Sequence, residues 1–276
     1  GVLDGTPFLV TAPISMYAVA TVSDAFPGMH GLGAKAEAAV ARTLSHIRKE
    51  TLPFGIRLDS AIPQGKGMAS SSADIAAVSY ATARALGREL TAQEIMDIAI
   101  AIEPSDGIAF AGLSHVSHTT GKLFGQYFNV PLLAVSIFDV GGTVDTIAYY
   151  RSKGNSGNHD EVYRQLLDTV DQAFRTRDLQ QEALLGQAAT ASARLNQVHL
   201  EKPKLEEFIT AAQRQGALGT LVAHSGTVVG VLWASDLSAV DMAQQTSELA
   251  AEFEATYHYM QTVRLISGGV VCEIRP

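Results

Sequence analysis

The stretch IPQGKGMASSSAD, residues 62–74, places two glycines shortly before three consecutive serines. The residues before it, 54–60, alternate apolar and polar side chains, which is the pattern of a half-buried strand. The residues after it, 73–86, are rich in alanine and carry apolar side chains at helical spacing, which predicts a tightly packed helix. The stretch is therefore predicted to be a glycine-rich turn that joins a strand to a helix.

A glycine-rich turn between a strand and a helix suits the binding of a phosphate group. The first turn of a helix has backbone N–H groups without intrahelical partners and carries the positive end of the helix dipole. Gly65 and Gly67 let the main chain approach a ligand closely, and the serine hydroxyls supply further donors or a metal ligand. A second interpretation stays open, in which Ser71 only caps the helix and Asp74 follows it as in a capping box.

Two well-known phosphate loops do not match these residues. The Walker pattern, Gly-x-x-x-x-Gly-Lys-Ser/Thr, is absent, and the other Gly-Lys pair, at residues 121–122, is followed by Leu123. The Rossmann pattern Gly-x-Gly-x-x-Gly would need a glycine where the chain has Ser70. Neither of these two nucleotide-binding folds is therefore expected.

The composition is that of a compact globular protein. Of the 276 residues, 47% are hydrophobic and 17% are charged. The net charge of −8 disfavours a nucleic acid as partner, and no apolar run reaches the ~18 residues of a membrane span, so the cytoplasm is the expected location. Cys272, the single cysteine, lies in the apolar run GGVVCEI and is expected to be a small buried side chain, with no disulfide within the chain.

Two acids, Glu103 and Asp106, follow a helix that is predicted at 91–104 and begins with a capping box of Thr91 and Glu94. A carboxylate at the C-terminal end of a helix faces the negative end of the dipole, at a cost of about 0.3–1 kcal/mol that a cation would offset. Magnesium typically takes one or two carboxylates and completes its coordination with phosphate oxygens and water. The pair therefore indicates a magnesium site, and the alternative is two acids that are merely solvated at a helix end.

Two weaker clusters of polar residues stand elsewhere in the chain. The segments 217–223 and 227–234 are predicted strands of a hairpin, and between them the residues HSG are ordinary turn residues that would leave His224 at an exposed tip. His115 and His118 have a spacing that fits one face of a helix. No third ligand stands beside them, so a zinc site is not expected.

The order of the elements favours an α+β fold in two layers, because strands and helices mix without a steady βαβ rhythm. The polar segment 151–160, rich in glycine and asparagine, is the best linker candidate, so we expect a boundary near 130–155 and two domains, 1–150 and 151–276. The remaining expected elements are helices at 33–50, 160–176, 178–196, 203–215 and 238–254, and strands at 131–140, 143–150, 260–267 and 270–274.

The glycine-rich turn resembles the Pro-x-x-x-Gly-Leu-x-Ser-Ser-Ala loop of the GHMP small-molecule kinases, the superfamily of galactokinase, homoserine kinase and mevalonate kinase. This resemblance implies a two-layer α+β fold, with an N-terminal nucleotide-binding domain and a ferredoxin-like C-terminal domain. It also implies ATP and Mg²⁺ as cofactors. The residues that match the loop are Pro63, Gly67, Met68, Ser70, Ser71 and Ala73, and the residues implied to hold the triphosphate are Pro63, Gly65, Lys66, Gly67, Met68, Ala69, Ser70, Ser71 and Ser72.

Within this superfamily the chain is most similar to the L-threonine kinases of cobalamin side-chain biosynthesis. The similarity rests on the segments LVTAPISMY (9–17), EPSDG (103–107) and AHSGT (223–227). It implies that ATP phosphorylates L-threonine to L-threonine O-3-phosphate. The group begins with a strand that bears Gly-Glu-x-x-Gln-Gly, and Gly1 matches its last residue, so this strand is expected to precede the chain. The implied roles are magnesium binding for Ser71 and Glu103, alignment or deprotonation of the acceptor hydroxyl for Asp106, and a substrate loop of His224, Ser225, Gly226 and Thr227.

Two other functions stay open at this point. Another GHMP activity, on homoserine or a related small alcohol, would use every loop named above. A non-catalytic nucleotide-binding protein on the same fold would keep the loop without turning over ATP. The expected partner is in each case a small molecule, with a hydroxyl group for the kinases. The oligomeric state is left open, with a homodimer as one option.

Overall fold

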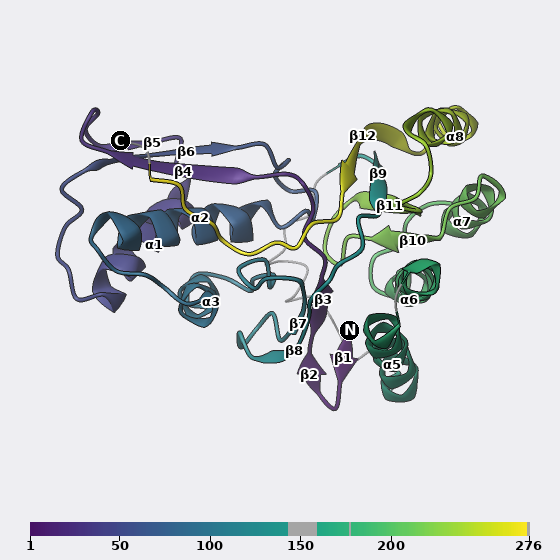
Figure 1. Ribbon diagram of the computed structural model, residues 1–276, viewed down its shortest axis with the longest axis horizontal. Helices are drawn as coiled ribbons and strands as arrows, with labels where there is room; N and C mark the ends of the chain where they lie inside the picture. The colour runs from purple at the N-terminus through teal and green to yellow at the C-terminus, as the bar shows by residue number, and fades with distance from the viewer. Residues whose placement is uncertain (143–158, 177, 275–276) are drawn as a thin grey trace. The chain divides into compact units, whose positions relative to one another are not determined.

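The computed structural model describes residues 1–142, 159–176 and 178–274, which form two compact units (Figure 1). The predicted strand at 143–150 and the expected domain boundary at residue 150 fall outside the described residues. The units interleave along the chain, so they differ from a simple split into two halves. Unit 1 comprises Gly1–Thr6, Gly65–Met68 and Asn129–Ile266, and unit 2 comprises Pro7–Gln64, Ala69–Phe128 and Ser267–Pro276.

Unit 2 combines three helices with two small sheets (Figure 1). In one sheet the central strand pairs with an antiparallel and a parallel neighbour, and the strands follow the order β4-β6-β5. The other sheet is antiparallel, with the order β3-β7-β8. The elements are β3 (Leu9–Thr11), β4 (Ala18–Ser23), β5 (Met29–His30), α1 (Ala34–His46), β6 (Gly55–Ser60), α2 (Ser70–Ala85), α3 (Ala92–Ile100), β7 (Leu113–Val116) and β8 (Leu123–Tyr127).

The predicted helix after the serines is α2, and its alanine-rich sequence explains how it packs. Ile75 and Val78 of α2 are fully buried in one cluster with Ala39 and Val40 of α1 and Ile56 of β6. Small side chains at the contact allow two helices to approach closely, and the apolar stripe then faces the sheet. Helix α2 is therefore fixed from two sides, and its N-terminal end is held in a defined place within unit 2.

Unit 1 is built on an antiparallel sheet with the order β10-β11-β9-β12, and helices α6, α7 and α8 line one side of it (Figure 1). The predicted hairpin is confirmed, since Val222 of β10 pairs with Val229 of β11. The mixture of helices and sheets in both units confirms the predicted α+β class. The elements are β9 (Ala134–Asp139), α5 (Asp160–Arg175), α6 (Asp178–Asn196), α7 (Leu205–Arg214), β10 (Gly219–Val222), β11 (Val228–Trp233), α8 (Ala239–Glu252) and β12 (His258–Arg264); the short strands β1 (Val2–Leu3) and β2 (Thr6–Pro7) pair near the start of the chain.

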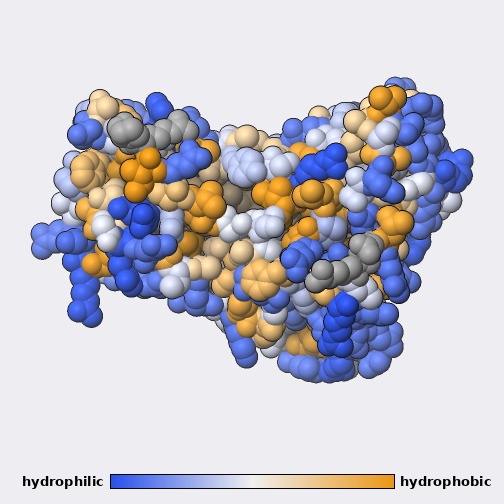
Figure 2. Space-filling view, viewed as in Figure 1, coloured by the Kyte–Doolittle hydropathy of each residue, from blue (hydrophilic) through white to orange (hydrophobic). Residues whose placement is uncertain are grey.

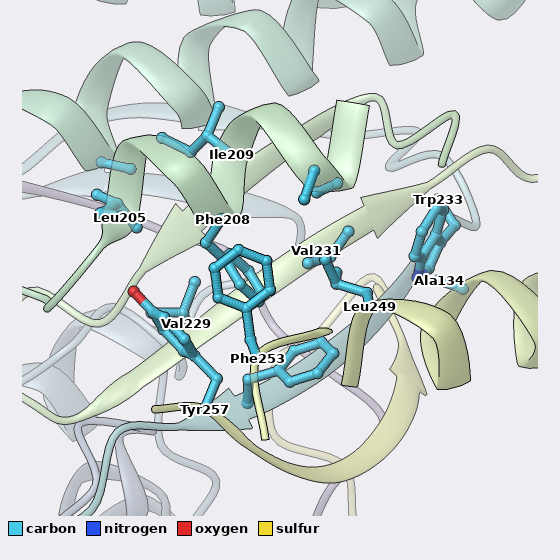
Figure 3. Close-up of a cluster of buried hydrophobic side chains, with 14 residues drawn as sticks. Ala134, Leu205, Phe208, Ile209, Val229, Val231, Trp233, Leu249, Phe253 and Tyr257 are labelled. Atoms are coloured by element: carbon cyan, nitrogen blue, oxygen red, sulfur yellow. The ribbon is translucent and has the colours of Figure 1, made fainter. Parts of the chain in front are cut away.

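An aromatic cluster forms the core between this sheet and its helices (Figure 3). The ring of Phe208 on α7 stacks on Tyr257, with 4.3 Å between the ring centroids, and Phe253 meets Phe208 edge to face. Buried Trp233 donates from Nε1 to Oγ of Ser136 at 2.8 Å, so its polar atom is satisfied. This packing fixes the C-terminal end of β11 against the helices.

Several expectations outside the core are wrong. The segment 270–274 forms no strand, and Cys272 is exposed instead of buried. His115 lies in strand β7, so the two histidines do not share a helical face.

No helix of the described residues is long and apolar enough to cross a membrane. Figure 2 shows hydrophilic residues interspersed among the hydrophobic ones on the face in view.

Candidate functional site

The N-terminal end of α2 is open to a ligand. The helix begins at Ser70 with Ala69 at the N-cap, and no side chain caps its first turn, so the interpretation of Ser71 as a capping residue is wrong. In contrast, Thr91 and Ser238 cap α3 and α8. The first turn of α2 also carries no acidic residue, whereas α1, α3, α5, α7 and α8 all do. Its first N–H groups and the positive end of its dipole therefore remain for an anion.

Ala69 adopts the left-handed conformation, with φ 59° and ψ 26°. This conformation costs a residue with a Cβ about 1–2 kcal/mol, and it comes without strain only to glycine. The strain at Ala69 is retained at the point where the chain turns into the uncapped helix.

Within unit 1, the loop residues 65–68 lie against the turn between β10 and β11. The N–H of Thr227 donates to the carbonyl of Lys66 at 3.1 Å. A Cβ added to Gly226 would stand 2.1 Å from the carbonyl oxygen of Lys66 and 2.4 Å from Cα of Gly67. The two backbones thus touch, and the structure joins the first half of the predicted nucleotide loop to the predicted substrate loop.

Lys66 forms a partly buried ion pair that the sequence did not indicate. Its Nζ lies 2.6 Å from Oδ2 of Asp139, at the end of β9, and donates to the carbonyl of Gly142 at 2.7 Å. Burial acts to raise the pKa of Asp139, but hydrogen bonds, chiefly from Lys66, outweigh it and hold the pKa below its ordinary value. Lys66 was expected to contact phosphate. In this structure its charge is paired with Asp139, and the pair ties the loop to the sheet.

Within unit 2, the serines at the start of α2 reach one of the two predicted acids. Oγ of Ser72 donates to Oδ2 of Asp106 at 3.3 Å and accepts from the N–H of Asp106 at 3.1 Å. The sequence predicted Ser71 as a magnesium ligand and did not predict the contact of Ser72 with Asp106. Ser71 precedes it by one residue and is partly exposed, so its hydroxyl remains available in the first turn.

The backbone around Asp106 is held on both sides. The N–H of Gly107 donates to Oγ1 of Thr11 on β3 at 3.0 Å, and Oγ of Ser114 on β7 donates to the carbonyl of Gly107 at 2.9 Å. Asp106 is half-buried. Burial, helped by the negative charge of Glu103 and opposed by the hydrogen bond from Ser72, raises the pKa of Asp106 to about 6. Such a carboxylate accepts a proton more readily than an ordinary surface aspartate.

Glu103 is buried, so the alternative of two solvated acids is wrong for it. Nζ of Lys35, near the start of α1, lies 2.6 Å from Oε2 of Glu103, and the side chains are 47% and 4% exposed, respectively. The second oxygen, Oε1, is buried and has no hydrogen-bond partner among the described residues. An unpartnered buried carboxylate oxygen is costly, and a cation is the group that would relieve it.

The oxygen atoms of Glu103 and of the serines at the start of α2 suit a magnesium ion better than a transition metal. Among the described residues, no three His, Cys, Asp or Glu side chains come together as a metal cluster. Magnesium needs only one or two carboxylates, and its other ligands are hydroxyls, phosphate oxygens and water. Oε1 of Glu103 and the hydroxyls of the first turn of α2 supply oxygen ligands of this kind.

The remaining predicted site residues differ in how far they are buried. His224 and Ser225 are half-buried in the turn, so His224 is not an exposed tip, and Gly226 and Thr227 are buried. Pro63 and Met68 are partly exposed. Sequence reasoning missed Lys35 and Asp139 because their partners lie 68 and 73 residues away in the chain. For Asp139 a local signal existed, since it ends an apolar strand two residues before Gly141 and Gly142.

Comparison with known proteins finds a matching family model and relatives that cover most of the chain. The family model described as the GHMP kinases N terminal domain matches residues 31–113, a span that holds α2 and both acids. The L-threonine kinase of Salmonella typhimurium is 31% identical over 273 residues, covering 96% of this chain and 89% of that protein. The L-threonine kinase of Citrobacter freundii is 29% identical over 273 residues, covering 96% and 92%.

Solved structures show the same fold at low identity. The putative homoserine kinase of Listeria monocytogenes has a TM-score of 0.66 and 15% identity, with 96% of each chain covered. The phosphomevalonate kinase of Streptococcus pneumoniae has a TM-score of 0.69 and 10% identity, covering 94% of this chain and 93% of that one. The fold, the matched family model and the relatives that extend over nearly the whole length agree, and the chain belongs to the GHMP family of small-molecule kinases.

Proposed function

We propose that this kinase transfers the γ-phosphoryl group of ATP to the hydroxyl of L-threonine and releases L-threonine O-3-phosphate and ADP. The observation that carries the proposal is the uncapped start of α2, whose Ser72 is hydrogen-bonded to the half-buried Asp106. The two relatives that carry the name L-threonine kinase support threonine as the acceptor. The similarity extends over 89% or more of the length of these relatives, so it is not limited to the nucleotide loop.

The loop from Gly65 to Ser72 holds the triphosphate in this proposal. Phosphoryl transfer depends mainly on in-line positioning and on stabilisation of the charge on the transferring group. The free N–H groups of the first turn of α2 donate to phosphate oxygens, and the helix dipole favours their negative charge. A bound magnesium ion, held by Glu103 and Ser71, would neutralise further charge on the phosphates.

Asp106 acts on the acceptor. With a pKa of about 6 it is mainly ionised at neutral pH, so it accepts a hydrogen bond from the threonine hydroxyl and takes its proton. The bond between the γ-phosphorus and the bridging oxygen of ADP breaks while a bond from the threonine oxygen to phosphorus forms. The hydrogen bond from Ser72 fixes the carboxylate of Asp106 in orientation. The same proposal places the reaction in the cytoplasm and in cobalamin biosynthesis, as the resemblance implies.

A panel of acceptors tests this function. Magnesium-dependent release of ADP is measured with L-threonine, L-serine, L-homoserine and mevalonate, and the phosphorylated product is identified by ³¹P NMR. We expect the highest kcat/KM with L-threonine and one phosphothreonine for each ADP. Faster turnover of another alcohol would contradict threonine as the substrate. If none of these acceptors led to release of ADP, the proposed kinase activity itself would be contradicted.

A further inference from the structure

Lys66, in the nucleotide loop, is held at two points within unit 1. Its main-chain carbonyl accepts from the N–H of Thr227 at 3.1 Å. Its Nζ lies 2.6 Å from Oδ2 of Asp139 and donates to the carbonyl of Gly142 at 2.7 Å. An ammonium group has three N–H donors, so two of them are used by acceptors of the protein itself.

The segment 65–68 needs support of this kind, because its own backbone is permissive. Gly65 and Gly67 have φ values of 71° and 77°. Glycine loses more conformational freedom on folding than any other residue, so the sequence of this segment does not by itself select one backbone shape. The segment ends directly before Ala69, the N-cap of α2, and its shape therefore decides how the chain enters the first turn of that helix.

Asp139 stands on a strand that is supported from both sides. It is the last residue of β9 and lies opposite Val228 of β11 and His258 of β12. The side chains of Lys66 and Asp139 are 19% and 13% exposed, so water competes weakly for their ion pair. The sheet thus offers a fixed point, and the ion pair attaches the permissive segment to it.

The charge of Asp139 does not suit a direct part in phosphate binding. Burial acts to raise its pKa, but hydrogen bonds, chiefly from Lys66, hold the pKa below its ordinary value, so the side chain is ionised at neutral pH. A carboxylate beside a loop that binds a triphosphate is unfavourable in itself, because like charges repel. It also occupies the ammonium group of Lys66. A role in geometry explains why an acid stands at this place.

We propose that Asp139 is a positioning residue for nucleotide binding, which acts through Lys66 and fixes the segment 65–68 in the one backbone shape that binds the triphosphate. Lys66 links the loop to the sheet and is not a ligand of the phosphates. The inference rests on the proposed function and deepens it, because affinity for ATP then depends on an acid that touches no part of the nucleotide.

Calorimetric binding of ATP in the presence of Mg²⁺ compares the parent with Asp139→Asn, Lys66→Met and the double variant. Each single change breaks the same ion pair and nearly keeps the size of the side chain. We expect each of them to raise the Kd for ATP by roughly 10- to 100-fold, and the double variant to raise it no further. The kcat at saturating ATP should stay within about threefold of the parent value. Asp168→Asn, which alters an exposed acid of α5, should bind ATP as the parent does.

A lysine that binds phosphate directly would give effects of opposite sign. Asp139→Asn would then free the ammonium group and remove a negative charge, so ATP would bind more tightly, while Lys66→Met would still weaken binding. That result would overturn the inference. Lower melting temperatures with an unchanged Kd for ATP would overturn it as well, because a pair that only stabilises the fold behaves in this way.

Lysine methylation of the parent, with formaldehyde and a borane reductant, keeps the test valid if the variants do not fold. Mass spectrometry should show that Lys66 reacts far more slowly than the exposed Lys204, with or without ATP. Rapid methylation of Lys66 that ATP suppresses would refute the inference. ATP binding that depends on the ion pair, without phosphorylation of L-threonine, would support the inference and refute the proposed acceptor. No ATP binding by the parent would refute both.

Discussion

Replacing Asp106 by asparagine is expected to lower kcat by roughly a hundredfold or more, with little change in the KM for ATP. Asparagine keeps the shape of the side chain and can still accept the hydrogen bond from Ser72, so the fold should be retained. It cannot take the proton of the acceptor hydroxyl. Steady-state kinetics of D106N beside Asp59→Asn, which alters an exposed acid of the same unit, make the comparison. Equal activity of D106N and the parent would remove Asp106 from the mechanism.

The same variant should be more stable than the parent in neutral solution without nucleotide or metal. Because folding raises the pKa of Asp106 from 3.8 to about 6, the folded state favours the protonated carboxyl, and this preference is lost as the pH rises through 6. At pH 8 the ionised group therefore opposes folding, by about 1–2 kcal/mol after allowance for its partial exposure. Thermal melts should show D106N several degrees above the parent at pH 8 and a smaller difference near pH 5. A difference that does not vary with pH would contradict the raised pKa.

Replacing Gly226 by alanine is expected to disrupt the contact between the two loops of unit 1. The new Cβ would stand 2.1 Å from the carbonyl oxygen of Lys66 and 2.4 Å from N and Cα of Gly67. These are backbone atoms, which cannot move aside as the end of a side chain can, so the segment 65–68 must shift. A displacement of this size in a phosphate-binding loop should raise the KM for ATP at least tenfold and lower kcat/KM by roughly a hundredfold.

The control for Gly226→Ala is Gly33→Ala. Gly33 has φ −88°, and a Cβ there would meet no atom within 4 Å. It should therefore leave the KM for ATP near the parent value. If Gly226→Ala binds ATP as the parent does, the close approach of the two loops has no role in nucleotide binding.

Local patterns predicted the elements around the site well. The strand at 54–60, helix α2 and the capping box of α3 follow from periodicity, alanine content and the Thr91–Glu94 spacing, all of which act within a few residues. The hairpin of β10 and β11 follows from two apolar runs around a Ser-Gly turn. The start of α2 was still misplaced, because serine is a common capping residue and Ser71 was considered for that role, while the N-cap is Ala69, two residues earlier.

Such local patterns could not predict contacts between residues that are far apart in the chain. The partners of Glu103 and Lys66 were invisible because Lys35 and Asp139 stand in other elements, far away in the chain. The apolar run at 270–274 looked like a strand, but a strand needs a partner and none of the described residues pairs with it there.

Calorimetric titration with ATP, with and without Mg²⁺, tests the central claim most directly. That claim is that the first turn of α2 binds the triphosphate with its ion beside the acids of unit 2. The parent should bind ATP in a magnesium-dependent way, and Ser71→Ala and Glu103→Gln should each weaken that binding at least tenfold. Asp59→Asn should bind as the parent does. Binding that ignores magnesium, or that is unchanged in both Ser71→Ala and Glu103→Gln, would contradict the claim.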